Sequence, residues 1–249
     1  MIETFRNAWR VPELRKKLLF TFFIIIIYRV GGTVPVPYLD SVALSAWFEQ
    51  SASSGDFFSY LNVLSGGNFS KATLLALSVS PYINAQIIIQ LLTYALPPLE
   101  RLQKEGPEGR KKLNKITKYA SLAIAIFQAW AYYLTMKKAG ACVYTEGFSK
   151  IFAEIVIIAC FTAGASLTIW LGDEINEKGI GNGISMLLFA GIIARGPSAV
   201  IGLFDYMKTG EAKNIILVIA ILVVFVLMIG FIIFMNEAER RIPIQYAKR

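Results

Sequence analysis

The sequence predicts an all-α polytopic membrane protein, and three observations support this fold class. Hydrophobic residues make up 55% of the 249 residues, and the mean hydropathy of +0.55 exceeds that of an ordinary soluble domain. The apolar residues form long runs of about 18 or more nearly uncharged positions, which is the length that crosses a bilayer as a helix. Most of the 25 Lys and Arg residues gather on one side of these runs.

Six apolar runs are candidates for transmembrane helices. The fifth is the weakest, because Arg195-Gly196-Pro197 interrupts it. No cleavable signal peptide is expected, because the first run lacks a small-residue cleavage site and leads directly into further spans. The predicted spans lie at about 18–36, 74–96, 116–136, 151–171, 180–206 and 215–235.

The distribution of positive charge predicts the orientation of these spans. Five Lys and Arg residues lie before the first span, seven lie in or just after the link that follows the second, one follows the fourth and four lie in the tail. The segments on the opposite side hold seven. Since positive loops stay in the cytoplasm, both ends are expected to be cytoplasmic and the segment 37–73 is expected to face outward.

The amino end is expected to form an amphipathic helix at the cytoplasmic interface, within residues 1–17. Ile2, Phe5 and Trp9 recur at helical spacing over residues 2–11, and Pro12 is expected to end the helix. The first span follows, with Arg29 near its outer end, and Pro35 and Pro37 are expected to stop it. Residues 38–60 are expected to be irregular.

The stretch "NVLSGGNFSKATLLALSVS" at 62–80 is too polar and too broken to span a bilayer, yet too apolar for a solvated loop. Gly66 and Gly67 each weaken a helix by roughly 1 kcal/mol relative to Ala. We therefore expect a short, weak helix on the outer side, with a break near 70–74 before the second span. Residues 62–72 are expected to lie on the outer side of the membrane spans and away from lipid.

The second span combines an apolar face with several polar side chains. Ile83, Ile87, Gln90 and Tyr94 share one helical face. Polar groups in the hydrocarbon zone are expected to face protein or water, or else to form hydrogen bonds between helices. These polar residues are Asn84, Gln86, Gln90 and Thr93.

The remaining links and spans carry weaker signals. The link "PPLERLQKEGPEGRKKLNK" at 97–115 is either a solvated loop or a docking surface for a cytoplasmic partner or anionic lipid. Small residues at 163–166 allow close helix approach in the fourth span. Gly179, Gly181 and Gly183 do not form a nucleotide fingerprint, because no strand precedes them and the spacing is wrong. Ile184 and Leu188 form an apolar pair in the fifth span.

Catalytic and metal chemistry is not expected from this sequence. The chain has no histidine, which is the commonest general base and metal ligand. Cys142 and Cys160 are expected to remain free thiols, because a largely helical stretch separates them too widely for a disulfide. We see no paired carboxylates, nucleophile and base, or phosphate loop, so neither an enzyme nor a cofactor nor a metal is expected.

Several distinctive stretches together resemble the SecY family, the channel subunits of the bacterial Sec protein translocase. They occur in the family's order along the whole chain: "PELRKKLLFTFFIIIIYRVGGTVPVP", "LSGGNFSKATLLALSVSPYINAQIIIQLL", "KEGPEGRKKLNKITKYA", "WLGDEINEKGIGNGIS" and "RRIPIQYAKR". The resemblance implies a channel of ten spans in two inverted halves of five. Residues 1–249 would then form a single membrane domain that is incomplete at its carboxyl end. Its first half would cover 18–206, and the sixth helix and the start of a cytoplasmic loop would cover 207–249.

The resemblance also implies roles for individual residues. The helix at about 59–73 would be the plug that closes the channel, with Leu64, Ser65, Gly66, Gly67, Asn68 and Phe69. Ile83, Ile87, Ile184 and Leu188 would form part of an apolar pore ring, with Leu188 where the family often has isoleucine. The second span would line a lateral gate through Asn84, Gln86, Gln90 and Thr93. Cytoplasmic partners would contact Arg110, Lys111, Lys112, Arg240 and Arg241.

The function implied is translocation of unfolded secretory proteins across the inner (plasma) membrane and insertion of membrane proteins into it. The implied partners are SecE and SecG in the membrane, the SecA motor or the ribosome in the cytoplasm, signal sequences, preproteins and lipids. No direct contact with nucleic acid is expected. Two alternatives remain open: a secondary transporter with a discontinuous helix at 62–80, and an inactive half-channel that acts only as a scaffold.

Overall fold

The computed structural model describes residues 11–51, 57–208 and 212–238, and it is helical throughout apart from turns and links. The chain divides into two compact units, residues 1–195 and 196–249. The boundary falls at Arg195-Gly196, within the interruption expected in the fifth span. The amphipathic helix predicted over 2–11 lies outside the described residues.

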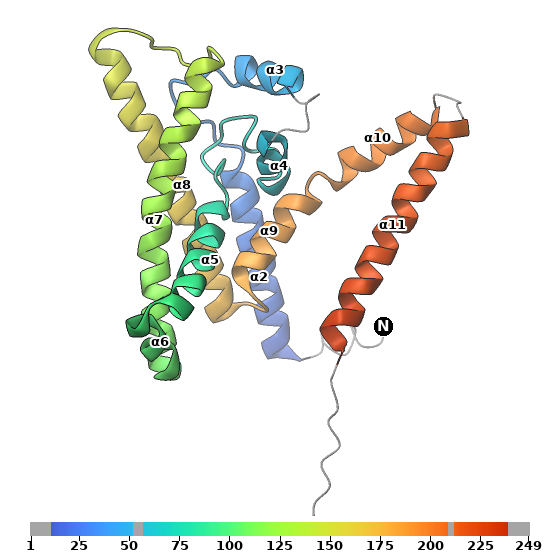
Figure 1. The fold of residues 1–249 in the computed structure, drawn as a ribbon. Coiled ribbons are helices and arrows are strands. Elements are labelled where there is room, and N and C mark those ends of the chain that lie inside the picture. The colour runs from blue at the N-terminus through green and yellow to red at the C-terminus, as the bar shows by residue number, and fades with distance from the viewer. Residues whose placement is uncertain (1–10, 52–56, 209–211, 239–249) are drawn as a thin grey trace, which may run out of the picture. The chain divides into compact units, whose positions relative to one another are not determined.

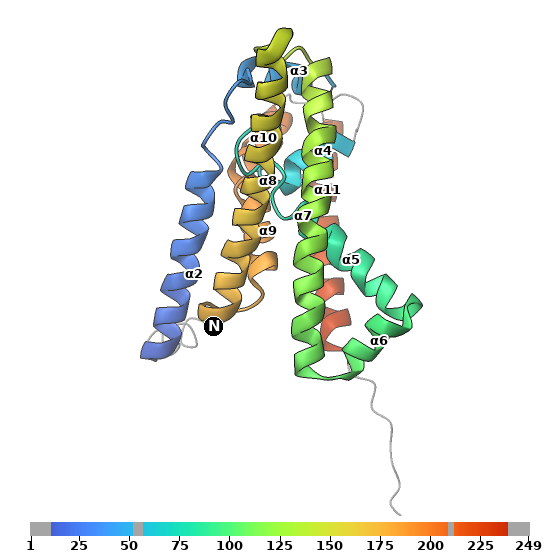
Figure 2. The same ribbon diagram turned by 90° about the vertical axis from the view of Figure 1, so that its left-hand side faces the viewer.

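The first unit contains eight helices among its described residues (Figure 1). Figures 1 and 2 show α7 and α8 running side by side, with α3 near the end at which α7 stops and α8 starts. Hydrogen bonds from Asp40 N–H to the Ala141 carbonyl and from Val143 N–H to the Tyr38 carbonyl join the strand-like link before α3 to the turn after α7. The helices are α2 (Pro12–Gly31), α3 (Ser41–Ser51), α4 (Phe57–Leu64), α5 (Ser80–Ala95), α6 (Pro97–Lys104), α7 (Pro107–Lys138), α8 (Gly147–Lys178) and α9 (Gly183–Ile193).

The first span differs from its predicted bounds of 18–36 at both ends. Pro12 begins α2, because a proline at the first helical position loses no hydrogen bond that the helix needs. The helix ends at Gly31, and the Gly32 N–H caps it by donating to the Tyr28 carbonyl. Two adjacent glycines therefore end this helix before Pro35 and Pro37 are reached.

Two segments contain helices that were not predicted from the sequence: 38–60, which was expected to be irregular, and the link 97–115, which was expected to be a solvated loop or a docking surface. Residues 38–60 contain α3 and the start of α4, and the Asp40 carboxylate accepts hydrogen bonds from the N–H groups of Val42 and Ala43 at the start of α3. The link 97–115 forms α6 and the first turns of α7, each of which begins with a proline in its first turn. Only the turn at Glu105-Gly106 separates these two helices, and Gly106 has a positive φ of 79°.

Three helical runs in the described part of the chain are long and apolar enough to cross a membrane, by length and composition alone. They are Gly147–Lys178, Gly183–Lys208 and Lys213–Glu237. The helix of the second predicted span, α5, has only 16 residues, because residues 74–79 are not helical. The count of six spans stays a prediction.

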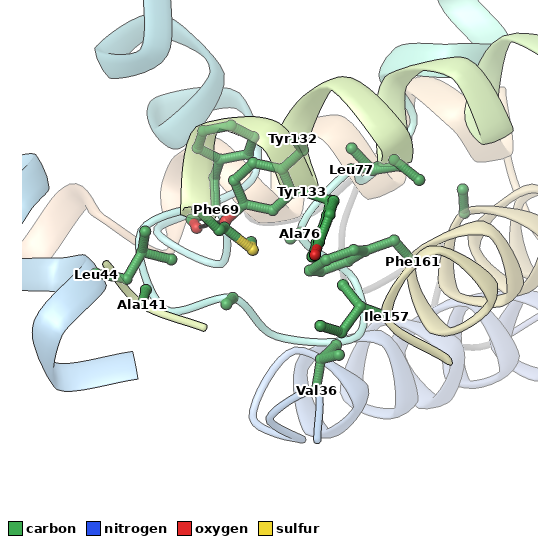
Figure 3. Close-up of a cluster of buried hydrophobic side chains, with 14 of the residues drawn as sticks. Val36, Leu44, Phe69, Ala76, Leu77, Tyr132, Tyr133, Ala141, Ile157 and Phe161 are labelled. Atoms are coloured by element: carbon green, nitrogen blue, oxygen red, sulfur yellow. Dashed lines mark hydrogen bonds between the residues drawn. The ribbon is translucent and has the colours of Figure 1, made fainter. Parts of the chain in front are cut away.

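The buried core of the first unit consists of two clusters. The larger packs α7 and α8 against α3 and the segment that follows α4, and Figure 3 shows its side chains meeting between these elements. The smaller packs α2, α8, α9 and the start of α5 around Tyr28, Leu75 and Leu187. Both clusters therefore include residues from the non-helical segment between α4 and α5.

The second unit contains α10 (Gly196–Lys208) and α11 (Ala212–Glu237). Its apolar side chains are mostly exposed, including Phe225, Leu227 and Phe234 of α11. A helix of 26 residues is roughly 39 Å long, which is sufficient to cross the hydrocarbon core. An apolar surface of this kind is typical of a helix that faces lipid.

Candidate functional site

The segment between α4 and α5 is not the helix that the sequence predicted. The predicted plug helix at about 59–73 is helical only as far as Leu64, and the predicted second span begins its helix at Ser80 instead of 74. Residues 65–79 form a series of turns. Left-handed backbone at Gly66 (φ 70°), Gly67 (φ 89°), Ala72 (φ 48°) and Ser78 (φ 50°) prevents a continuous helix.

Local hydrogen bonds close the first part of this segment on itself. The Gly67 N–H donates to the Asn62 carbonyl at 2.8 Å, and the Ser70 N–H donates to Asn62 Oδ1 at 3.0 Å. Ser65 is buried, and its hydroxyl accepts from the Phe69 N–H at 3.0 Å. The polar residues that weaken a helix thus satisfy the backbone of a compact turn.

The second part is tied to the chain after α2. The Leu74 N–H donates to the Val34 carbonyl at 2.8 Å, and the Val36 N–H donates to the Ala72 carbonyl at 3.1 Å. The Tyr28 hydroxyl and the Ser78 hydroxyl are also hydrogen-bonded, at 2.9 Å. Irregular backbone at membrane depth requires partners of this kind, because lipid supplies none.

Phe69 anchors the segment in the larger core cluster. Its side chain is buried and stacks on Tyr132 of α7 (Figure 3), with ring centroids 4.1 Å apart. The ring of Phe48 meets the Phe69 ring edge-on. The Tyr132 hydroxyl donates to the Phe69 backbone carbonyl. No feature of the sequence marked Tyr132 in advance, because an aromatic residue in an apolar span is ordinary.

Gly66 brings the segment into close contact with α9. A Cβ at Gly66 would lie 2.6 Å from the Gly191 carbonyl oxygen and 3.1 Å from an Arg29 guanidinium nitrogen. A Cβ at Gly191 would lie 3.0 Å from the Leu64 carbonyl oxygen. The absence of side chains at both glycines lets the two backbones approach each other, and Gly191 is a residue that sequence analysis did not single out.

A cavity of about 540 Å³ lies beside this segment. It brings together predicted plug residues and predicted ring residues, and no charged side chain is among those that line it. The lining residues of the predicted site are Leu64, Phe69, Ile83, Asn84 and Leu188, and Tyr132 lines it with them.

The four predicted ring residues are placed differently. Ile83 and Leu188 line the cavity and pack against the smaller core cluster, which also contains the buried Ile184. Ile87 is 51% exposed and lies outside both the cavity lining and the clusters. The chain thus brings three of the four side chains together and leaves Ile87 on an open face of α5.

The polar residues of α5 also separate. Asn84, Gln86 and Gln90 are all exposed on the surface of the helix, and of these three only Asn84 lines the cavity. Thr93 is buried, and its hydroxyl donates to the Ile89 carbonyl one turn earlier at 2.7 Å. Thr93 therefore bonds within its own helix and does not join α5 to another.

The cationic residues are described only in part. Arg110, Lys111 and Lys112 are exposed on the first turns of α7, and the Lys112 ammonium lies 3.5 Å from the Glu105 carboxylate. Arg240 and Arg241 lie outside the described residues. An exposed pair of this kind contributes little to stability, about 0–1 kcal/mol, so these charges remain available to a partner.

Both cysteines are free and partly buried. Burial raises the pKa of the Cys142 thiol in the link between α7 and α8, the charge of Lys137 opposes this shift, and that of Glu154 adds to it. No group of three His, Cys, Asp or Glu residues that could hold a metal ion occurs in the part of the chain that the structure describes.

The comparisons with known proteins agree on one family. The SecY family model matches residues 73–249, a range that begins after the predicted plug residues. The SecY translocase subunit of Streptomyces coelicolor is 39% identical over 259 residues, which cover 100% of this chain and 58% of that protein. The SecY of Aquifex aeolicus is also 39% identical, over 255 residues, with the same coverage. The chain thus spans less than two thirds of the length of these relatives.

Solved structures share the fold. A protein-conducting channel superposes with a TM-score of 0.59 at 20% identity, covering 87% of this chain and 47% of that chain. A structure reported for the SecY plug domain, described as stabilising the closed channel and maintaining a membrane seal, gives 0.59 at 22% identity, with 87% and 46% coverage. At these identities the likeness establishes the fold alone. From the family match and the relatives together, the chain belongs to the SecY family of membrane channel proteins.

Proposed function

We propose that this chain forms a large part of a protein-conducting channel subunit. The subunit would translocate unfolded secretory proteins across the plasma membrane and insert membrane proteins into it. The observation that carries this proposal is the uncharged cavity in which Ile83 of α5 and Leu188 of α9 lie with Leu64 and Phe69 of the intervening segment. The relatives named as protein translocase subunits support it.

The ring would resist ions because its side chains offer them no ligand. A narrow constriction of Ile and Leu dewets, and a dewetted constriction blocks ions and water. Ile83, Ile184 and Leu188 supply such side chains close together, and Ile87 would extend the ring where it faces the rest of the pore. Branched aliphatic groups can separate and close again around many substrates, because they form no directional bonds.

The segment 57–79 would be the plug that closes the channel on its outer side. Displacing it requires loss of the Phe69–Tyr132 stack and of the contact between Gly66 and Gly191. The turn structure of residues 65–79 suits this role, because turns can move as a unit without unwinding a long helix. The hinge between the plug and α5 would end at Ser80, where α5 begins.

The exposed face of α5 would contact signal sequences at a lateral gate. Gln86, Ile87 and Gln90 are exposed on this helix, and Asn84 lies at the cavity. A polar helix face exposed within the membrane is costly unless protein or water covers it. A signal sequence, or the remaining spans of the channel, would provide that cover.

The driving force would come from cytoplasmic partners. The exposed cations Arg110, Lys111 and Lys112, together with Arg240 and Arg241, would contact the SecA motor or the ribosome. One structural relative is Sec61 in a canine ribosome–channel complex from the endoplasmic reticulum, and this relative supports the ribosome as a partner. SecE, SecG and lipids would surround the subunit, whose amino end would be cytoplasmic with residues 1–249 forming one membrane domain.

Deleting residues 62–72 from the full-length native gene product tests the proposal. Resting ion conductance of reconstituted protein should rise well above that of the parent, because the deletion removes the segment that closes the cavity. Thermal unfolding of the purified variant serves as the control for folding. A folded deletion variant with the parent's conductance would contradict the proposed plug.

A secondary transporter is less well supported. A discontinuous helix before α5 fits that class, but a proton or solute site requires polar or charged groups that converge. The cavity lining has hydroxyl and amide groups but no ionisable acid or base other than tyrosine. Solute uptake by reconstituted protein would favour the transporter.

A further inference from the structure

Two asparagines of the segment before α5 have opposite hydrogen-bonding status. Asn62 Oδ1 accepts from the Ser70 N–H at 3.0 Å. Asn68 is 7% exposed, and its Nδ2 is the one buried side-chain nitrogen or oxygen without a partner in the part of the chain that the structure describes. The position of this segment in the structure is called the seated conformation below. The Asn62 amide stabilises the seated conformation, whereas burial of the unpaired Asn68 amide costs free energy.

The surroundings of Asn68 keep its amide in place. The Asn68 backbone carbonyl accepts from the Thr73 N–H at 3.3 Å and from the Thr73 hydroxyl at 3.4 Å. Its side chain lies against the end of α2, where a Cβ on Gly32 would come within 2.8 Å of Nδ2 and 2.9 Å of Oδ1. Gly32 lacks that Cβ, and so leaves room for the amide but supplies no acceptor for it.

We propose that Asn68 sets the threshold for opening, because its unpaired amide destabilises the seated conformation of residues 65–69. When the segment leaves its seat, Nδ2 reaches water and regains its hydrogen bonds, whereas Phe69 and Ser65 lose theirs. Asn68 thus opposes the contacts that hold the segment closed. The consequence for channel gating rests on the proposed function, but the conformational claim does not.

The size of the effect follows from the cost of an unpaired buried amide. Replacing Asn68 by leucine, which has nearly the same shape and no polar group, removes that cost from the seated state. The ratio of displaced to seated segment should fall roughly 5- to 30-fold. Signal sequences that open the parent channel weakly should then open the variant less well.

Thiol labelling of a buried reporter tests this. Ser65→Cys places the reporter at a position that is 1% exposed, in a background that carries Cys142→Ser and Cys160→Ser. The full-length native gene product is held in nanodiscs, where a polar maleimide can reach both faces. At low maleimide concentration the labelling rate follows the equilibrium population of the displaced segment.

We expect Asn68→Leu to slow the labelling roughly 5- to 30-fold, and the smaller Asn68→Ala to slow it less, because it leaves a void. The matched control, Asn62→Leu, should accelerate the labelling, since it removes the acceptor of the Ser70 N–H. Cooperative thermal unfolding identifies any variant that fails to fold. Labelling of folded Asn68→Leu and Asn68→Ala at or above the parent's rate would overturn the inference.

The outcome is separable from that of the proposed function. If deletion of 62–72 left the resting conductance unchanged while Asn68→Leu slowed the labelling, the proposed plug would be contradicted and the role of Asn68 in the seated conformation would stand. If the deletion raised conductance and Asn68→Leu labelled at the parent's rate, only the inference about Asn68 would fail.

Discussion

The ring of Phe69 stacks on the ring of Tyr132 with centroids 4.1 Å apart and planes 20° apart, and the Tyr132 hydroxyl donates to the Phe69 carbonyl. One residue of α7 therefore holds both the side chain and the backbone of the segment before α5. Both residues also line the cavity, so closure of the segment and packing of α7 depend on the same contact.

Substitutions at Phe69 and Tyr132 should displace the segment more often when they remove more of its contacts. Tyr132→Phe keeps the stack and removes one of the two hydrogen bonds that the Phe69 carbonyl accepts, at a cost of about 0.5–1.5 kcal/mol, because the Ala72 N–H still donates to that carbonyl at 3.2 Å. Phe69→Ala also removes a buried ring, at a cost of about 3–5 kcal/mol. Resting conductance and reporter labelling at position 65 should rise in that order. Phe127→Ala, an exposed position on the same helix, is the control, and an equal effect there would contradict the anchor.

The two neighbouring glycines should respond differently to alanine. Both have positive φ, so each pays a conformational cost of about 1–2 kcal/mol. Only Gly66→Ala adds a Cβ 2.6 Å from the Gly191 carbonyl oxygen, whereas nothing lies within 4 Å of one at Gly67. Gly66→Ala should therefore raise reporter labelling several-fold more than Gly67→Ala. Equal effects would show that the contact with α9 does not hold the segment.

Removing ring side chains should make the channel leak. Ile83→Gly with Leu188→Gly removes the apolar groups from the cavity, and adding Ile87→Gly should raise the resting conductance further. A glycine in a helix costs about 1 kcal/mol, so Leu91→Gly at an exposed position of α5 controls for the helix itself. If replacement of Ile83 and Ile87 left the channel tight, the pore face would be wrongly assigned.

Gly164 should tolerate no side chain. A Cβ there would overlap the Leu74 backbone carbonyl, so Gly164→Ala should destabilise the first unit by about 1–3 kcal/mol through overpacking. Gly202→Ala in α10 meets no atom within 4 Å and should be neutral or stabilising by up to about 1 kcal/mol. Thermal unfolding in detergent measures both. Equal stability of the two variants would contradict the close approach of α8 to residue 74.

The alkylation rate of Cys142 should rise with pH over a higher pH range than that of an exposed cysteine. Burial raises the pKa of this thiol, so at pH 8 less of it is the reactive thiolate than in an exposed cysteine. Alkylation should reach its half-maximal rate at a higher pH than in a model peptide. Lys137→Gln removes a charge that favours the thiolate and should shift the profile further upward. A downward shift in either protein would refute the assignment.

Part of the candidate site could be predicted and part could not. The family resemblance implied that Ile83 and Leu188 lie in one ring, and both side chains line one cavity. The helical plug at 59–73 was wrong beyond Leu64 because local composition indicates a weak helix but not which turns replace it. The helices within 38–60 and 97–115 were missed because polar and charged residues were read as loops, although Asp40 and the prolines at 97 and 107 are typical of helix starts.

The sequence by itself determined the fold class, the family and the break at Arg195-Gly196, because hydropathy, glycine and proline act locally along the chain. Only the tertiary structure decided how residues 65–79 are held. Tyr132 lies 63 positions from Phe69, and Gly191 lies still further from Gly66. Contacts of this kind depend on where whole helices pack, so an isolated stretch of sequence cannot encode a stacked ring, two touching glycine backbones or an amide left without a partner.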